Sequence, residues 1–244
     1  MGRLLVKESG VRVQWESVQV GGHSMPVYLG TPAAGAQAPA MVVIQHAGGV
    51  DAPIQDMVHR LCREGYAAAA PALFHRQPAE GLDAMTRIGQ LHDDEVMADV
   101  DATVDLLRAR GHAALGIVGF CMGGRVSYLA ACTNTHLRAA VVFYGGNIMK
   151  AWGAGPSPLE RTAGIGCPLA GFFGADDTNP SPADVQTISS ELTRLGKWHE
   201  FQTYQEAGHA FHNFTTERYR ERAARASFAA MMAFLEDRLR PTVG

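Results

Sequence analysis

The chain has 244 residues, of which 47% are hydrophobic and 18% charged, with a formal net charge of -3 and a pI near 6.4. This length and apolar content suffice for one large core, so we expect a single domain over residues 1–244. The charge balance offers no basic face to a phosphate backbone, which excludes nucleic acid as an expected partner.

The chain carries no sign of export or membrane insertion. The N-terminal stretch MGRLLVKESGVRVQW has no apolar run long enough for a signal-peptide core, and no later segment approaches the roughly 20 apolar residues of a membrane span. Cys62, Cys121, Cys132 and Cys167 show no CxxC pairing. We therefore predict a cytoplasmic protein with free thiols and no membrane partner.

The N-terminal region has the pattern of paired strands. Apolar and polar residues alternate from Val11 to Leu29, with a change of phase after Trp15 and a break at Gly21-Gly22. Such alternation around a glycine turn predicts an antiparallel hairpin, and the phase change predicts a β-bulge near Glu16.

From residue 40 onward, short apolar runs alternate with amphipathic segments. The expected strands are 40–45, 66–70, 115–119, 138–143, 169–173 and 200–204. The expected helices are 53–64, 94–110, a helix through 126–132, 181–195 and 216–240. Residues 74–90 and 147–166 are predicted to be irregular and to wall a pocket. The alternation predicts an α/β fold, with a mostly parallel central sheet, helices on both faces and the N-terminal antiparallel hairpin.

The hexapeptide Gly-Phe-Cys-Met-Gly-Gly, residues 119–124, lies between a buried run and an amphipathic segment. Glycines stand two residues before and two after Cys121, as in the GxSxG nucleophile elbow of α/β-hydrolases, a turn too tight for Cβ atoms at those places. Cys121 is then expected at a helix N-terminus, where unsatisfied N–H groups favour the thiolate. Alternatively, Cys121 is one more small buried residue in a glycine-rich turn.

Later strands supply candidate partners in the required order of nucleophile, acid and histidine. Asp176 and Asp177 follow the run 169–173, and Asp176 is preferred because it lies closer to the strand end. His209 follows the last expected strand and is preferred over His212 because it adjoins a glycine. Alternatively, these side chains are solvated loop residues, or one aspartate caps the next helix. We predict a triad of Cys121, Asp176 and His209.

Together, six motifs make the chain resemble the dienelactone hydrolase family from about residue 14 to 240. They are VVIQHAGG, PALFHRQ, GFCMGG, VVFYGG, FFGADD and YQEAGHAF. The resemblance implies an α/β-hydrolase fold with a Cys-Asp-His triad, which falls on Cys121, Asp176 and His209. It also implies an oxyanion hole formed by the backbone N–H groups of Ala47 and Met122, as is general for this fold.

The resemblance extends in part to a substrate pocket. Arg76 matches an arginine that in the family helps to hold a substrate carboxylate, and Tyr144 matches a pocket tyrosine. Two positions depart from the family pattern: His46 replaces an activating glutamate, and Asn213 replaces a second carboxylate-binding arginine. We expect His46 to lie close to Cys121 and to affect its ionisation.

The predicted function is hydrolysis of a small lactone or carboxylic ester, as by a carboxymethylenebutenolidase, through covalent cysteine catalysis. No metal or organic cofactor is expected. Alternatives are a thioesterase or general carboxylesterase of the same fold, a catalytically silent binding module, and a redox protein, for which Cys121 lacks a nearby resolving cysteine. Nothing in the sequence indicates an oligomeric state.

Overall fold

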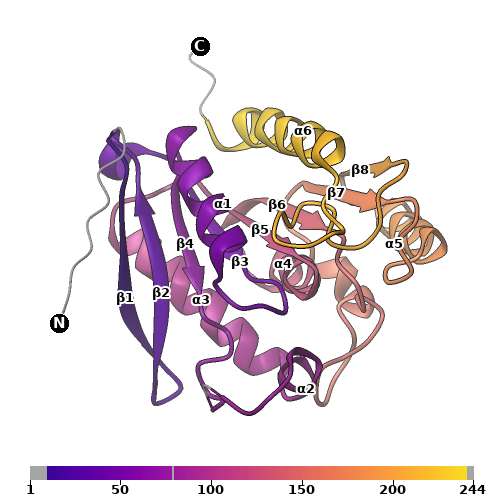
Figure 1. The fold of residues 1–244 in the computed structure, drawn as a ribbon, viewed down its shortest axis with the longest axis horizontal. Coiled ribbons are helices and arrows are strands. Elements are labelled where there is room, and N and C mark those ends of the chain that lie inside the picture. Colours follow the sequence, from indigo (N-terminus) through magenta and orange to yellow (C-terminus); the bar gives the residue numbers. More distant parts are fainter. Residues whose placement is uncertain (1–9, 79, 241–244) are drawn as a thin grey trace.

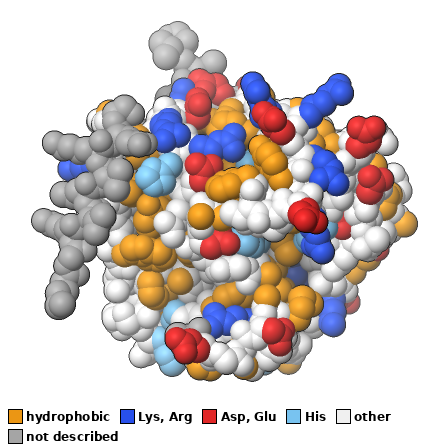
Figure 2. All heavy atoms as spheres, viewed as in Figure 1, with side chains coloured by type: hydrophobic (Ala, Val, Ile, Leu, Met, Phe, Trp, Pro, Cys, Tyr) orange, Lys and Arg blue, Asp and Glu red, His pale blue; other side chains and the backbone are white. Residues whose placement is uncertain are grey.

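The structure, a computed structural model, describes residues 10–78 and 80–240 (Figure 1). The expectation that the N-terminus lacks a signal-peptide core falls largely on residues 1–9, which lie outside this range. Within it, none of the helices is long and apolar enough to cross a membrane. On the face shown in Figure 2, acidic and basic side chains are interspersed with apolar ones.

Eight strands form one mixed sheet in the order β1-β2-β4-β3-β5-β6-β7-β8. Their bounds are β1 Arg12–Val20, β2 His23–Thr31, β3 Ala40–Ile44, β4 Ala67–Pro71, β5 Leu115–Phe120, β6 Leu137–Phe143, β7 Leu169–Gly174 and β8 His199–Tyr204. Strands β3 to β8 are parallel, and β1 and β2 are antiparallel. The predicted fold class is thus confirmed.

Helices cover both faces of the sheet (Figure 1). They are α1 Ala52–Arg63, α2 Ala84–Gly89, α3 Asp93–Ala109, α4 Met122–Thr133, α5 Pro182–Arg194 and α6 Glu221–Leu239, with short 3-10 turns at Gly35–Gln37 and Leu159–Gly164. Apolar side chains of α1 and α6 pack in one core, and those of α3, α4 and α5 pack in the other. The sheet therefore lies between two hydrophobic layers, as expected for parallel strands buried on both faces.

The expected β-bulge near Glu16 is absent, because β1 and β2 pair without a break from Arg12↔Thr31 to Val20↔His23. The change of phase has another cause. Val13 packs in the core beneath α1 and α6, whereas Val20 packs in the core on the opposite face. The two ends of this regular strand therefore pack in different cores, so its apolar residues change from one face of the sheet to the other along the strand. The sequence pattern alone cannot distinguish this arrangement from a bulge.

Two expected boundaries are also wrong. Residues 84–89 form α2, although the segment was expected to be irregular; the Asp83 carboxylate caps it by accepting from the N–H groups of Met85 and Thr86. Helix α6 begins at Glu221 rather than at residue 216. Residues 214–220 instead form a loop that ends beside the site described next.

Candidate active site

The segment around Cys121 forms a strained strand-to-helix turn. Cys121 has φ 57° and ψ -122°, a backbone conformation that side-chain-bearing residues rarely adopt. A Cβ on Gly119 would lie 1.9 Å from the Gly123 carbonyl oxygen, and a Cβ on Gly123 would lie 2.4 Å from that of Gln45. Both glycines are therefore required by close backbone contacts, as the GxCxG pattern predicted.

Cys121 occupies the N-cap position of α4, a helix of 12 residues. The first N–H groups of a helix have no partner within it, and Met122 supplies the first of them. These groups and the helix dipole favour negative charge at this end. A thiolate on Cys121, or an oxyanion formed beside it, would be stabilised there.

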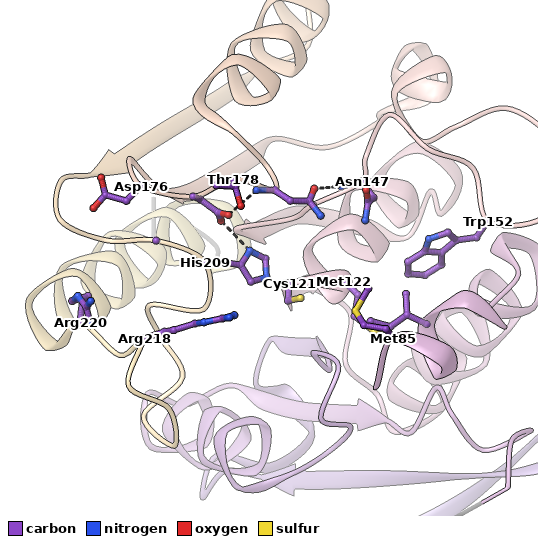
Figure 3. A pocket seen from close by; sticks show the side chains of 15 residues that line it. Met85, Cys121, Met122, Asn147, Trp152, Asp176, Thr178, His209, Arg218 and Arg220 are labelled. Carbon is purple, nitrogen blue, oxygen red and sulfur yellow. Dashed lines mark hydrogen bonds and ion pairs between the residues drawn. The ribbon is translucent and has the colours of Figure 1, made fainter. Parts of the chain in front are cut away.

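His209 connects the turn after β8 to the turn after β7. Its Nδ1 lies 2.9 Å from Oδ2 of Asp177, whose side chain is 1% exposed. The other carboxylate oxygen accepts from the Asn179 N–H at 2.9 Å. With Nδ1–H donated to Asp177, the Nε2 edge is left for Cys121, which Figure 3 shows beside the imidazole.

The carboxylate that orients His209 is therefore Asp177, which corrects the preference for Asp176. Residues 174–177 form a tight turn in which the Asp177 N–H donates to the Gly174 carbonyl. Asp176 stands at the corner of this turn, is exposed, and in Figure 3 points away from His209. Proximity to the strand end was the wrong criterion, because the chain turns back toward the sheet edge one residue later.

The charges around His209 favour its protonated form. Burial lowers the pKa of the imidazole, but the hydrogen bonds and negative charges of Asp177 and Cys121 outweigh it and raise the pKa to about 10. At neutral pH His209 is therefore an imidazolium held between the Asp177 carboxylate and the Cys121 sulfur.

Tyr144 supports this pair from behind. It is buried, with φ 37°, and its ring meets that of His209 edge-on at 5.3 Å between centroids. Burial, and secondarily the charge of Cys121, raises the pKa of its hydroxyl well above the ordinary value. Tyr144 does not line the cavity, so the structure places it behind His209 rather than in the expected pocket.

His212, the alternative base, is buried, and this burial lowers its pKa to about 3. Its ring packs against those of Phe120 and Phe143. It is therefore a neutral core residue under ordinary conditions, consistent with the preference for His209.

The expected second oxyanion donor, Ala47, lies in a turn next to the elbow. Strand β3 pairs with β5 so that Ile44 faces Gly119, and the turn at His46–Gly49 follows β3 directly. The close contact between Gln45 and Gly123 described above fixes this turn against the start of α4. The turn that carries Ala47 thus lies at the same sheet edge as the start of α4, and the role of Ala47 as a second donor stays a prediction.

His46 does not take the position of an activating residue. Its Nε2 hydrogen-bonds Oδ1 of Asp51 at 3.0 Å, and its Nδ1 accepts from the Gly48 N–H at 3.0 Å. Both ring nitrogens are therefore used within the turn after β3. The expectation that His46 affects the ionisation of Cys121 is not supported by this geometry, which gives the imidazole a structural role.

Arg76 and Asn213 are also engaged elsewhere. Both Nη atoms of Arg76 donate to the fully buried Asp99 carboxylate at 2.7 Å. The Asn213 side-chain oxygen accepts from the N–H and hydroxyl of Thr215 at 3.0 and 2.7 Å. Neither residue lines the cavity beside Cys121. The expected carboxylate contact through Arg76 is therefore replaced by a buried ion pair.

A cavity of about 430 Å³ opens beside Cys121 and His209 (Figure 3). Met85, Ile88, Asn147 and Trp152 line it and belong to segments 74–90 and 147–166, which were expected to wall a pocket, whereas Thr178 and Arg218 were not expected. They lie on α2 and on loops, where no periodic pattern marks a binding residue. Arg218 was missed because residues 216–240 were expected to form a helix, whereas Arg218 lies in the loop before α6. Within the described part of the chain, no group of three or more His, Cys, Asp and Glu side chains forms a metal site.

Comparison with known proteins identifies related chains. The model of the dienelactone hydrolase family matches residues 25–239. A protein of Methylorubrum extorquens named "Putative carboxymethylenebutenolidase" is 34% identical over 212 residues, which are 82% of this chain and 72% of that protein. A Salmonella typhimurium protein of the same name is 32% identical over 226 residues, 88% of this chain and 84% of that one.

Among solved structures, one described as a "Putative Dienelactone Hydrolase from Klebsiella pneumoniae" superposes with a TM-score of 0.86 and 31% sequence identity. The match covers 91% of this chain and 97% of that one. The family model spans the sheet from β2 onward, including Cys121, Asp177 and His209. The chain therefore belongs to the dienelactone hydrolase family.

Proposed function

We propose that the protein hydrolyses a small lactone or carboxylic ester through covalent catalysis by Cys121, with His209 as acid and base and Asp177 as its orienting carboxylate. The observation that carries the proposal is the position of His209, which hydrogen-bonds buried Asp177 on one side and contacts Cys121 on the other. A module that only bound a ligand would not require this strained and charged arrangement. The carboxymethylenebutenolidase name of the relatives agrees with this chemistry.

The steps follow from the geometry. The Cys121 thiolate adds to the carbonyl carbon, and the N–H groups of Met122 and Ala47 stabilise the oxyanion. As the tetrahedral intermediate collapses, the C–O bond breaks and His209 gives its Nε2 proton to the leaving oxygen. The neutral imidazole then takes a proton from water, whose oxygen attacks the thioester. Collapse of this second intermediate releases the carboxylic acid and restores the thiolate and imidazolium.

A first prediction concerns thiol reactivity. Burial raises the pKa of Cys62, Cys132 and Cys167 to about 12 in each case, so these thiols stay protonated near neutral pH. Limiting iodoacetamide at pH 7 is therefore expected to modify Cys121 alone and to abolish hydrolysis of p-nitrophenyl acetate. Peptide mass spectrometry measures the site. Label on another cysteine with the activity lost at the same rate would contradict the proposal.

A second prediction concerns substrate charge. Arg218 extends into the cavity toward Cys121 (Figure 3), and among the described residues its guanidinium makes no ion pair or hydrogen bond. A substrate carboxylate is expected to bind Arg218 rather than Arg76. Replacing Arg218 with Gln should raise the KM ratio of a carboxylated lactone to an uncharged analogue about tenfold, the value of one charge-assisted hydrogen bond.

Arg76→Gln is the matched control. It removes the cationic partner of the buried Asp99 carboxylate and leaves only the contact with His75, so it should lower the free energy of unfolding by about 3 kcal/mol, measured by urea denaturation. The KM ratio should stay unchanged in the folded variant. A larger change in the KM ratio for Arg76→Gln than for Arg218→Gln would assign the carboxylate to Arg76.

A further inference from the structure

The cavity differs in chemistry on the two sides of Cys121. On the side away from His209 its wall carries the apolar side chains of Met85, Ile88, Met122 and Trp152, with Asn147 next to Trp152. On the side of His209 it is polar and contains the Arg218 guanidinium. Figure 3 shows Cys121 and His209 between these two halves, with Trp152 and Met85 on one side and Arg218 on the other. A substrate bound at Cys121 therefore meets an apolar half and a polar half.

The indole of Trp152 is held in place by a buried ion pair. Its backbone N–H donates to the Asp93 carboxylate at 3.0 Å, and its carbonyl accepts from the Asp93 N–H at 2.9 Å. The Arg125 guanidinium lies 3.9 Å from the centre of the indole ring. Trp152 is only 9% exposed. These contacts fix the ring before any ligand arrives, which reduces the entropy lost on binding.

The ion pair connects this wall to the nucleophile. Arg125 is fully buried on the first turn of α4, four residues after Cys121, and its Nη2 donates to Asp93 at 2.9 Å. The same guanidinium donates to the carbonyls of Lys150 and Asn147. The loop that carries Trp152 is thus tied to the helix whose N-terminus holds the reacting sulfur.

The opposite side of the apolar half is formed by α2. Ile88 and Met85 project from this six-residue helix, and Met85 is 71% exposed although it lines the cavity. An apolar group of a ligand that covers this exposed thioether would remove apolar surface from water, which favours binding. Trp152 on one side and Met85 and Ile88 on the other thus line the apolar half of the cavity, which we call the slot.

The direction of catalysis decides which part of a substrate enters the slot. The leaving oxygen must lie within hydrogen-bonding reach of His209 Nε2 when the C–O bond breaks. The alcohol part therefore lies on the polar side, near Arg218. The acyl substituent, on the other side of the carbonyl carbon, extends past Met122 toward Trp152.

We propose that the slot between Trp152 and α2 is an acyl-binding site that selects apolar acyl groups longer than acetyl. The inference rests on the proposed function, because it uses His209 to orient the ester. Each methylene moved from water into an apolar site is worth about a fourfold gain in binding. The selectivity should therefore follow the length of the acyl chain and not that of the alcohol.

Two isomeric esters separate acyl from alcohol selectivity. Ethyl hexanoate and hexyl acetate have the same composition, but only the first places a six-carbon chain on the acyl side. We expect kcat/KM, measured by pH-stat titration with the full chain, to be at least tenfold higher for ethyl hexanoate. Equal values, or a preference for hexyl acetate, would overturn the acyl site while leaving the proposed function intact.

Variants test the walls directly. Trp152→Ala should reduce the ratio of the two kcat/KM values several-fold, and Met85→Ser should reduce it as well without touching the buried ion pair. Met149→Ser, at an exposed methionine outside the cavity, is the matched control and should keep the wild-type ratio. A ratio unchanged in Met85→Ser and in folded Trp152→Ala would overturn the inference. Failure of the wild type to hydrolyse either p-nitrophenyl acetate or p-nitrophenyl hexanoate would overturn the proposed function itself.

Discussion

Replacing Asp177 with Asn is expected to lower kcat by about 10³- to 10⁴-fold. The amide can keep the contact with His209 Nδ1, but its NH₂ group favours a ring with the proton on Nε2. Such a neutral ring cannot accept the water proton at Nε2, and the imidazolium loses its buried counter-charge. Steady-state kinetics with p-nitrophenyl acetate measure the loss, and circular dichroism checks the fold.

Asp176→Asn is the matched control, because the two residues are adjacent, equal in charge and both line the cavity. Asp176 is exposed and points away from His209, so its substitution is expected to change kcat less than threefold. If Asp176→Asn were the more damaging change, the hydrogen bond between Asp177 and His209 would not be the one used in turnover.

Most of the fold was predictable because its signals are local and periodic. Each parallel strand is a short apolar run buried on both faces, such as 115–120, where every residue is buried. The hairpin was predicted correctly, but the expected bulge in it is absent. Val13 and Val20 pack in different cores, and the alternation of apolar residues does not show which core each one faces. Helix α2 is only six residues long, too short for a helical period to show.

The proposed catalytic residues were predictable to the extent that their position in the fold follows from the chain order of the strands. Cys121 and His209 each follow a strand whose carboxyl end meets the same sheet edge, and each has a glycine neighbour or near neighbour. The choice between Asp176 and Asp177 depended on the turn at 174–177, whose shape is set by a hydrogen bond to Gly174. Two adjacent aspartates in a sequence do not reveal which of them makes this hydrogen bond.

Two segments expected to wall the pocket do line it, but its individual residues were the least predictable part of the site, because distant partners decide them. Arg76 pairs with Asp99, 23 residues further along the chain, and so does not line the cavity. Trp152 becomes a wall residue only through Asp93 and Arg125 on two other helices. A single sequence gives residue types and spacing, but it does not pair side chains across such separations.

The pH dependence of His209 follows from its raised pKa. An imidazolium with a folded-state pKa of about 10, against an ordinary 6.5, contributes stability that is fully present below about pH 6.5 and is lost as the pH rises to about 10. His212 acts in the opposite direction, because its pKa is lowered to about 3: stability falls as the pH drops from about 6.5 toward 3. Thermal unfolding should therefore show a maximum in Tm near neutral pH.

Replacing His209 with Ala should slow alkylation of Cys121 at pH 6 by about 30- to 100-fold. An ordinary thiol with a pKa near 8.5 is only about 0.3% ionised at that pH, whereas the proposed pairing with an imidazolium at a helix N-terminus would favour the reactive thiolate. The expected difference in alkylation rate between wild type and variant is smaller than the ratio of their thiolate fractions, because a less basic thiolate is a weaker nucleophile. Iodoacetamide rates from pH 5 to 10 measure the effect. A wild-type rate that rises tenfold per pH unit up to pH 8.5, like that of a free thiol, would contradict the resting ion pair. Such a result would mean that Cys121 becomes a nucleophile only after His209 removes its proton in the substrate complex.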